Sequence, residues 1–174
     1  MADYKMKKKV ILNICIEVFL ILVFVAIDLL TKIYIYEPIN QEASDIILIK
    51  NVLKFTAVQN TGASFGIFKN NANILGIVSL IIIIIIFTIQ VLSISKLKDK
   101  LIRIGFILIV AGGIGNIVDR FMLGHVRDFI YFEIIDFPVF NIADSCLTIG
   151  CFLVILYVVI FYVKDFKKDQ KNKE

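Results

Sequence analysis

The 174-residue sequence has little of the chemistry that holds metals or forms disulfide bridges. It contains one histidine, His125, and three cysteines, none of them arranged as CxxC. Because protein zinc sites are built mainly from His and Cys ligands, we expect no metal site and no cofactor. The odd number of cysteines and their apolar surroundings predict buried thiols rather than a disulfide framework. These cysteines are Cys15, Cys146 and Cys151.

The sequence is also poor in polar residues. Hydrophobic residues make up 59% of the chain, and the mean hydropathy is +0.89. Soluble domains contain about 45–50% apolar residues, so the excess indicates side chains that face lipid.

Four apolar runs are long enough to cross a membrane, which takes roughly 20 helical residues. They cover about residues 10–30, 74–92, 101–118 and 146–163. The first follows a lysine cluster, as in a cleavable signal sequence, but it is too long and no small-residue cleavage site follows it. We therefore expect it to stay attached. The chain has no internal repeat, low-complexity tract or linker, so residues 1–174 are expected to form one membrane-embedded domain.

The basic residues predict the orientation of the four spans. Thirteen of the 19 Lys and Arg residues fall on one side of a four-span arrangement. The positive-inside rule assigns that side, with both termini, to the cytoplasm. The net charge of +4 is then explained by topology and anionic lipid, and nucleic acid is not an expected partner. The thirteen are Lys5, Lys7, Lys8, Lys9, Lys96, Lys98, Lys100, Arg103, Lys164, Lys167, Lys168, Lys171 and Lys173.

Two segments remain outside, residues 31–73 and 119–145. The first is expected to begin as a polar loop at 37–45 and to become strand-like at 46–59, where β-branched residues are frequent. The turn NTGASFG then leads back to the second span. The predicted fold is therefore an all-α polytopic membrane protein with four transmembrane helices and a small extracytoplasmic sheet.

Acidic residues gather at the outer ends of the spans, where ionisable groups are costly and therefore functional candidates. Asp28 and Lys32 are four residues apart, so the simplest interpretation is an ion pair on one helix. Glu17 lies nearer the cytoplasm, where it is expected to snorkel or to pair within the bundle, and it has no assigned role. The outer acids are Asp28, Asp119, Asp128, Glu133, Asp136 and Asp144.

One pattern occurs twice, an asparagine three residues before an aspartate. Asn116 precedes Asp119, and Asn141 precedes Asp144, each pair on one helical face. Such groups could form a polar clasp between helices. Alternatively, two carboxylates that share a proton could activate water against a peptide carbonyl. No Ser–Lys or Cys–His pair is evident on this side, and His125 is expected to be a loop residue.

Five ordered blocks of the sequence resemble the lipoprotein signal peptidases (signal peptidase II), bacterial aspartic enzymes that remove signal peptides from prolipoproteins. The blocks extend over nearly the whole chain, and their order at the outer ends of four spans makes the resemblance specific. They are DLLTK (28–32), NTGASFG (60–66), GGIGNIVDR (112–120), VRDFI (126–130) and FNIADS (140–145).

The resemblance implies a catalytic pair, Asp128 and Asp144, under an outer β-cradle. Asp119 is then a supporting residue, in agreement with its neighbour Arg120, a permanent cation that favours an ionised Asp119. Other residues are implied to line the site or brace it. The lining residues are Asn60, Gly62, Asn116, Arg120 and Asn141, and the bracing residues are Asp28 and Lys32.

The implied substrate is a membrane-held diacylglyceryl-prolipoprotein, cut just before the modified cysteine. The implied location is the bacterial cell membrane, with the active site at the extracytoplasmic face and lipid as a further partner. Two alternatives remain. One is a proton- or cation-coupled transporter that uses Asp28, Asp119 and Asp144, and the other is a non-enzymatic assembly subunit. Transporter acids usually lie near mid-bilayer beside broken helices, whereas these acids share one face and the spans lack proline.

Overall fold

The computed structural model describes residues 2–62, 71–93 and 99–171. Residues 63–66 of the NTGASFG block, together with Lys96, Lys98 and Lys173 of the basic set, lie outside these ranges.

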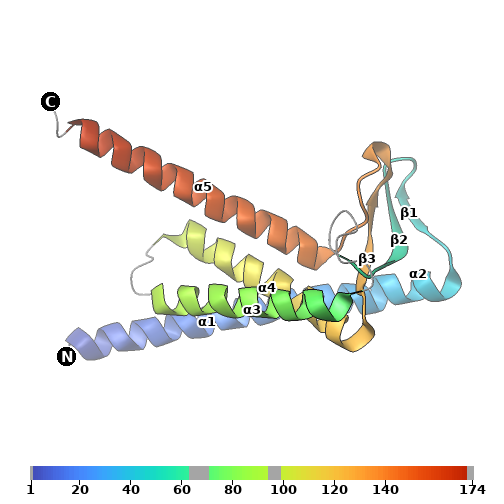
Figure 1. Cartoon of the computed structure of the whole chain (residues 1–174), viewed down its shortest axis with the longest axis horizontal. Helices are drawn as coiled ribbons and strands as arrows, with labels where there is room; N and C mark the ends of the chain where they lie inside the picture. The colour runs from blue at the N-terminus through green and yellow to red at the C-terminus, as the bar shows by residue number, and fades with distance from the viewer. Residues whose placement is uncertain (1, 63–70, 94–98, 172–174) are drawn as a thin grey trace.

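Four long helices form the body of the protein, and each contains one predicted span. They are long and apolar enough to cross a membrane. Figure 1 shows the helices extended along one direction, with both chain ends at one end of the molecule and the sheet at the other. This confirms the predicted fold class. The helices are α1 (Ala2–Thr31), α3 (Ala72–Ser93), α4 (Lys100–Leu123) and α5 (Ile142–Lys171).

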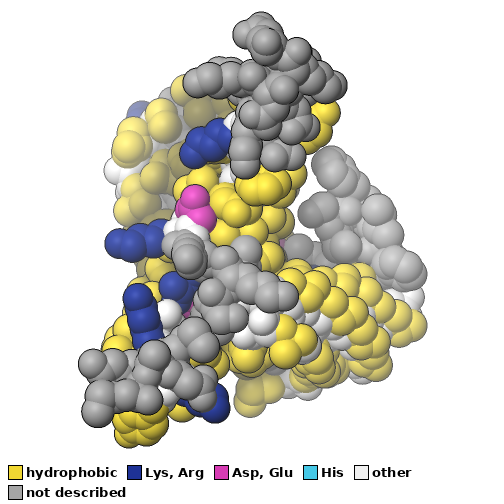
Figure 2. Space-filling model, turned by 90° about the vertical axis from the view of Figure 1, so that its left-hand side faces the viewer, with side chains coloured by type: hydrophobic (Ala, Val, Ile, Leu, Met, Phe, Trp, Pro, Cys, Tyr) yellow, Lys and Arg dark blue, Asp and Glu magenta, His cyan; other side chains and the backbone are white. Residues whose placement is uncertain are grey.

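Described members of the predicted cytoplasmic basic set lie at the end of the molecule where the termini lie. Figure 2 views the molecule from this end and shows Lys and Arg side chains among hydrophobic helix surfaces. Lys8, Lys9, Lys100 and Lys164 are all exposed.

The glycines of α4 allow its neighbours to approach closely. A Cβ at Gly112 would lie 2.4 Å from the backbone oxygen of Ala143 in α5. A Cβ at Gly115 would lie 2.4 Å from Oδ2 of Asp28 in α1. Small residues at such contacts are the usual means of close helix packing in membranes. As a result α4 is the most buried of the long helices and brings α1 and α5 together at the outer end.

The predicted polar loop at 37–45 is wrong over most of its length. The chain continues from α1 through a π-helical turn, η1 (Lys32–Tyr36), into a short helix, α2 (Glu37–Glu42), and ends at Ala43 with φ of 50°. Pro38 stands in the first turn of α2, directly after the π-helical turn. Tyr36 and Ile39 are buried, so apolar contacts hold the segment in place.

The outer sheet has three antiparallel strands in the order β1-β2-β3. β1 (Ile46–Ile49) and β2 (Leu53–Asn60) divide the segment predicted to be strand-like, and β3 (Val126–Phe132) contains the VRDFI block. Val58 pairs with Asp128, and Asn60 pairs with Val126. The sheet therefore carries Asn60 and Asp128 on neighbouring strands.

A buried polar cluster joins three helices in the half nearer the termini. Glu17 of α1 accepts hydrogen bonds from Nε of Arg103 in α4 and, at 2.9 Å, from Nε2 of Gln90 in α3. Glu17 and Gln90 are buried. Glu17 was expected either to snorkel or to pair within the bundle, and the structure shows the pairing.

All three cysteines are free thiols, as expected, but only Cys146 is buried. Cys15 and Cys151 are exposed on the helix surfaces, so the prediction of burial is wrong for them. An apolar run in a membrane helix faces lipid on one side, and apolar surroundings in sequence therefore do not imply burial within the protein.

Candidate active site

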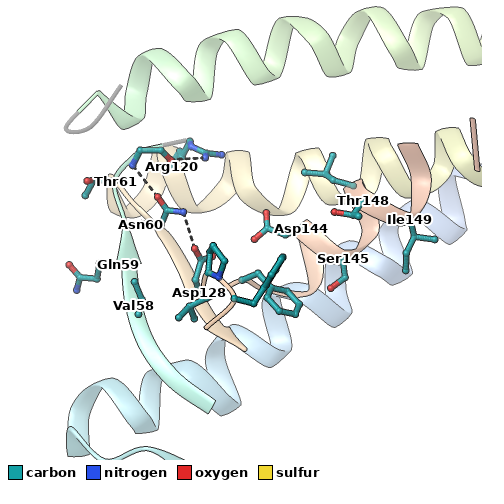
Figure 3. Close-up of a pocket in the computed structure, with 16 residues that line it drawn as sticks. Val58, Gln59, Asn60, Thr61, Arg120, Asp128, Asp144, Ser145, Thr148 and Ile149 are labelled. Carbon is teal, nitrogen blue, oxygen red and sulfur yellow. Dashed lines mark hydrogen bonds between the residues drawn. The ribbon is translucent and has the colours of Figure 1, made fainter. Parts of the chain in front are cut away.

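Two aspartates reach one cavity from different elements. Asp128 is supplied by β3 and is 1% exposed, and Asp144 is supplied by the first turn of α5 and is half-buried. Both line a cavity of about 1190 Å³ between the sheet and the outer end of α5. Figure 3 shows these two side chains with Asn60 and Arg120 around this space. The polar wall of the cavity is thus formed by residues distant in sequence.

Asn141 fixes both aspartates at once. It precedes the first residue of α5, and its Oδ1 accepts a hydrogen bond of 2.8 Å from the backbone N–H of Asp144. The Asp144 carboxylate in turn accepts from the backbone N–H of Asn141 at 3.2 Å, which completes a capping box with aspartate in the acidic position. The Nδ2 of Asn141 donates to Asp128 at 2.7 Å. One cap therefore sets the relative position of the two carboxylates.

Two further asparagines bind the remaining carboxylate oxygens. Asn60 donates to Oδ2 of Asp128 at 2.9 Å, and Asn116 donates to Oδ1 of Asp144 at 2.7 Å. Asn116 also accepts from Asn141 at 3.1 Å. The two Asn-x-x-Asp motifs do converge, but they pair crosswise, since Asn116 binds the aspartate of the other motif. The expected clasp between helices therefore shares Asn116, Asn141 and Asp144 with the candidate site.

The environment of Asp128 makes it a proton carrier at neutral pH. Burial, followed by the negative charge of Asp144, raises the pKa of Asp128 to about 7. Hydrogen bonds from Asn60 and Asn141 and the charge of Lys32 act in the opposite direction and are outweighed. With a pKa of about 7, the carboxyl group of Asp128 is partly protonated at neutral pH.

Asp119 is held by cations other than the one predicted. Nη2 of Arg127 donates to its Oδ1 at 2.7 Å, and Nζ of Lys32 lies 3.1 Å from its Oδ2. Arg120 instead extends to the cavity, where its Nη2 donates to the carbonyl of Gly62 at 3.4 Å. Adjacent helical residues point in directions about 100° apart, so the guanidinium of Arg120 does not point toward the carboxylate of Asp119.

Behind the two aspartates lies a row of alternating charges. Lys32 forms an ion pair with Asp28 at 2.8 Å as well as with Asp119, and Arg127 reaches Glu37 of α2 at 2.9 Å. The row joins α1, α4, β3 and α2. Its members are Asp28, Lys32, Asp119, Arg127 and Glu37.

The row also holds the elements that carry the two cavity aspartates. The carboxylate of Asp28 accepts from the backbone N–H of Ala143 in α5 at 2.9 Å. Asp119 accepts from the backbone N–H of Arg127 in β3 at 3.0 Å. The predicted bracing position of Asp28 and Lys32 agrees with these contacts. Sequence reasoning missed Arg127 and Glu37. Alternation along a strand could have indicated that Arg127 points to the face opposite Asp128.

Some candidate residues lie elsewhere. His125 contacts the carbonyl of Leu123 and does not line the cavity, as expected of a loop residue. Glu133 lies near Lys54, and Asp136 accepts a hydrogen bond from Tyr131 at 2.6 Å, both at the far end of the sheet. Within residues 2–62, 71–93 and 99–171, no group of three or more His, Cys, Asp or Glu side chains could hold a metal ion.

The chain is similar to proteins of one family over most of its length. A family model described as signal peptidase (SPase) II matches residues 20–160. The lipoprotein signal peptidase of Clostridium acetobutylicum is 35% identical over 160 residues, which cover 89% of this chain and 99% of the relative. That of Clostridioides difficile is 37% identical over 148 residues, 85% and 97% of the two chains.

Solved structures give the same result for the fold. A chain described as a bacterial membrane enzyme structure obtained by the in meso method at 2.3 Å resolution superposes with a TM-score of 0.70. It is 31% identical in sequence, and the match covers 92% of this chain and 93% of that chain. A second such structure, at 1.9 Å resolution, has the same TM-score with 32% identity and covers 83% and 93% of the two chains.

Proposed function

The chain belongs to the signal peptidase II family and is a multi-pass membrane protease that removes signal peptides from prolipoproteins, and we propose that Asp128 and Asp144 are its catalytic pair. The observation that carries this proposal is that both carboxylates line one cavity and are joined through Asn141. The family assignment gives no support to the transporter interpretation. Two of the acids that it would use, Asp28 and Asp119, are engaged in ion pairs with Lys32.

In the proposed reaction, Asp144 is the base and Asp128 holds the proton. A water molecule bound between them attacks the scissile carbonyl carbon while its proton passes to Asp144, and Asp128 gives its proton to the carbonyl oxygen. Collapse of the tetrahedral intermediate breaks the C–N bond. The leaving nitrogen takes the proton from Asp144, and one hydroxyl of the intermediate returns its proton to Asp128 as the new carboxyl group forms. The raised pKa of Asp128 supports its part.

The remaining polar residues then orient the reactants. Asn60, Asn116 and Asn141 hold the carboxylates by donating to them, so that the lone pairs on the cavity side stay available. Arg120 brings a cation to the cavity wall, where it can bind a carbonyl oxygen of the substrate backbone. Gly62, whose N–H donates to the side chain of Asn60, contributes backbone to the same wall.

The apolar part of the cavity fits a lipid-modified substrate. Leu147 and Ile149 of α5 form one wall and the segment 137–140 forms another. Because α5 is long and apolar enough to span the membrane, we propose that cleavage occurs at the membrane boundary, just before the diacylglyceryl-modified cysteine.

We further propose that the protein resides in the bacterial cell membrane with its termini in the cytoplasm, because basic residues gather at that end. The test is to replace the native cysteines and add Glu42→Cys or Lys98→Cys. An impermeant thiol reagent applied to intact cells should label position 42 and not position 98. Labelling at position 98 alone would reverse the orientation.

The proposed reaction is tested with purified protein in liposomes and two forms of one prolipoprotein, with and without the diacylglyceryl group. Mass spectrometry of the products locates the cut. Cleavage before the lipidated cysteine is expected, and the unmodified form should react far more slowly because each buried CH₂ contributes roughly 0.8 kcal/mol of anchoring. Equal rates for the two forms, or undiminished cleavage by Asp144→Asn, would contradict the proposal.

A further inference from the structure

The end of the outer sheet farthest from the catalytic pair is unusually apolar and exposed. Ile47 of β1 is 66% exposed, and Ile134 and Ile135 in the 3-10 turn η3 (Glu133–Ile135) are 65% and 67% exposed. A hydrogen bond of 2.9 Å from the N–H of Glu133 to the carbonyl of Val52 holds η3 against the β1–β2 turn. We call this region the sheet tip. It comprises Ile46–Ile49, Ile134, Ile135 and Phe137.

The sheet tip is apolar on more than one side. All four residues of β1 are exposed hydrophobic residues, although alternate side chains of a strand point to opposite faces. In the described part of the chain β1 is also the edge of the sheet, so one side of its backbone has no partner strand there. An apolar edge strand of this kind in water is prone to aggregate. A protein partner docked on one face would leave the other face in water, whereas lipid covers an inserted tip from all sides.

Charged groups beside the sheet tip are mostly paired with one another. Lys54 forms an ion pair with Asp45 at 2.9 Å and lies 3.7 Å from Glu133. The hydroxyl of Tyr131 donates to Asp136 at 2.6 Å. Because Lys54 and Asp45 form an ion pair, these two groups can approach a low-dielectric medium at reduced cost. Lys50, in the β1–β2 turn, is exposed and suits lipid phosphate groups.

The apolar surface is continuous with the side of α5 that faces lipid. Ile149 and Phe152 of α5 are 52% and 62% exposed. Ile149 also lines the cavity together with the segment 137–140, which leads from the sheet tip into α5. Figure 1 shows the sheet lying across the outer end of the helices and its tip extending past the end of α5. The tip therefore overhangs the position of the lipid beside α5.

We propose that the sheet tip inserts into the interfacial region of the outer leaflet beside α5 and anchors the sheet over the cavity. The bound partner is bilayer lipid. Attachment at the tip, together with the covalent link through α2 and α5, holds the sheet at both ends. The cavity then opens toward the lipid from which a membrane-held substrate approaches.

The absence of tryptophan from the sequence allows a direct test. Ile135→Trp introduces a single fluorescent probe at the sheet tip, and Glu42→Trp introduces a control probe at an exposed site on α2. In proteoliposomes, the tip probe should show blue-shifted emission and strong quenching by lipids brominated in the upper acyl chain. The control probe should show neither effect.

Two outcomes would overturn the proposal. One is emission from the tip probe that matches the control probe and is not quenched by brominated lipid. The other is blue-shifted emission that is insensitive to brominated lipid and decreases when the protein is diluted in lipid, which would show that a second copy of the chain covers the tip.

A second experiment measures enzyme kinetics. It rests on the proposed function, and its result is interpreted separately from the fluorescence result. The double variant Ile134→Ser with Ile135→Ser should raise KM for a bilayer-embedded substrate by roughly three- to tenfold. It should leave kcat unchanged. The conservative pair Ile134→Val with Ile135→Val should behave as the native protein. An unchanged KM together with an unquenched tip probe would refute anchoring, while complete inactivity of the native protein would refute only the proposed function.

Discussion

Replacing Asp128 or Asp144 by asparagine removes the ability to share a proton while keeping the side-chain volume. At Asp128 the new amide can accept from only one of Asn60 and Asn141, so the variant loses one buried hydrogen bond. That loss costs about 1–3 kcal/mol of folding free energy, which a typical domain tolerates. The loss of acid–base catalysis should reduce turnover by about 10²–10⁴-fold, or about 2.7–5.5 kcal/mol in the activation barrier. The double variant should be little worse than either single one, because the pair acts as a unit.

The same change at Asp119 should act on folding instead. Asp119 is fully buried and accepts from the backbone and guanidinium of Arg127 while pairing with Lys32. The Asp119→Asn variant would leave Lys32 with Asp28 and Arg127 with Glu37 as their remaining anionic partners. Breaking a buried pair costs about 3–5 kcal/mol. The yield of folded protein should therefore fall, while the molecules that remain folded keep measurable turnover.

The assay is cleavage of a lipidated prolipoprotein in liposomes, normalised to folded protein measured by gel filtration. A thermal denaturation curve for each variant separates stability from catalysis. Near-normal turnover per folded molecule of Asp128→Asn, alongside a folded but inactive Asp119→Asn, would refute the reasoning. Asp119 would then belong to the catalytic pair.

Three further predictions concern pH, metals and the buried cluster near the termini. Because the pKa of Asp128 is raised to about 7, its proton is retained below that pH and lost above it, so kcat should fall as pH rises through 7. A kcat that keeps rising well above pH 7 would exclude Asp128 as the acid. Turnover should be unaffected by EDTA, and a loss restored by Zn²⁺ would contradict an aspartic mechanism. Glu17→Leu or Arg103→Leu alone should lower the melting temperature, and the double variant should recover part of the loss, because an apolar pair can replace a buried ion pair. A double variant less stable than both single ones would show that the pair is not the stabilising contact.

The four long helices could be predicted because apolar runs of this length are typical of membrane spans. The gathering of acids at one end of these helices followed from their places in the sequence. The strand tendency of residues 46–59 could be predicted equally well, since β-branched residues are concentrated there. The continuation of α1 into α2 could not, because the segment that begins with Glu37 has the composition of a polar loop. Burial of Tyr36 and Ile39 outweighs that composition, and such tertiary contacts are absent from a local pattern.

The partners of the charged residues were harder to predict than their positions in the fold. Asp119 was expected to rely on Arg120, its neighbour in sequence, whereas its cations come from η1 and from β3. The Asn-x-x-Asp repeat correctly predicted two converging faces, but the crosswise bond from Asn116 to Asp144 depends on how α4 and α5 pack. Periodicity gives the face of a helix on which a residue lies, and only packing gives the group it meets.

The cluster around Glu17 has a consequence for biosynthesis. Glu17 and its ionic partner Arg103 are 86 residues apart. At the usual 5–20 residues per second, α1 is made roughly 4 to 17 s before the counter-ion of Glu17 exists. Until then the carboxylate has no Arg103 to bind, and a charge without a counter-ion disfavours deep insertion of its helix. The ion pair of Glu17 can therefore form only after α4, the third of the four long helices, has begun to emerge.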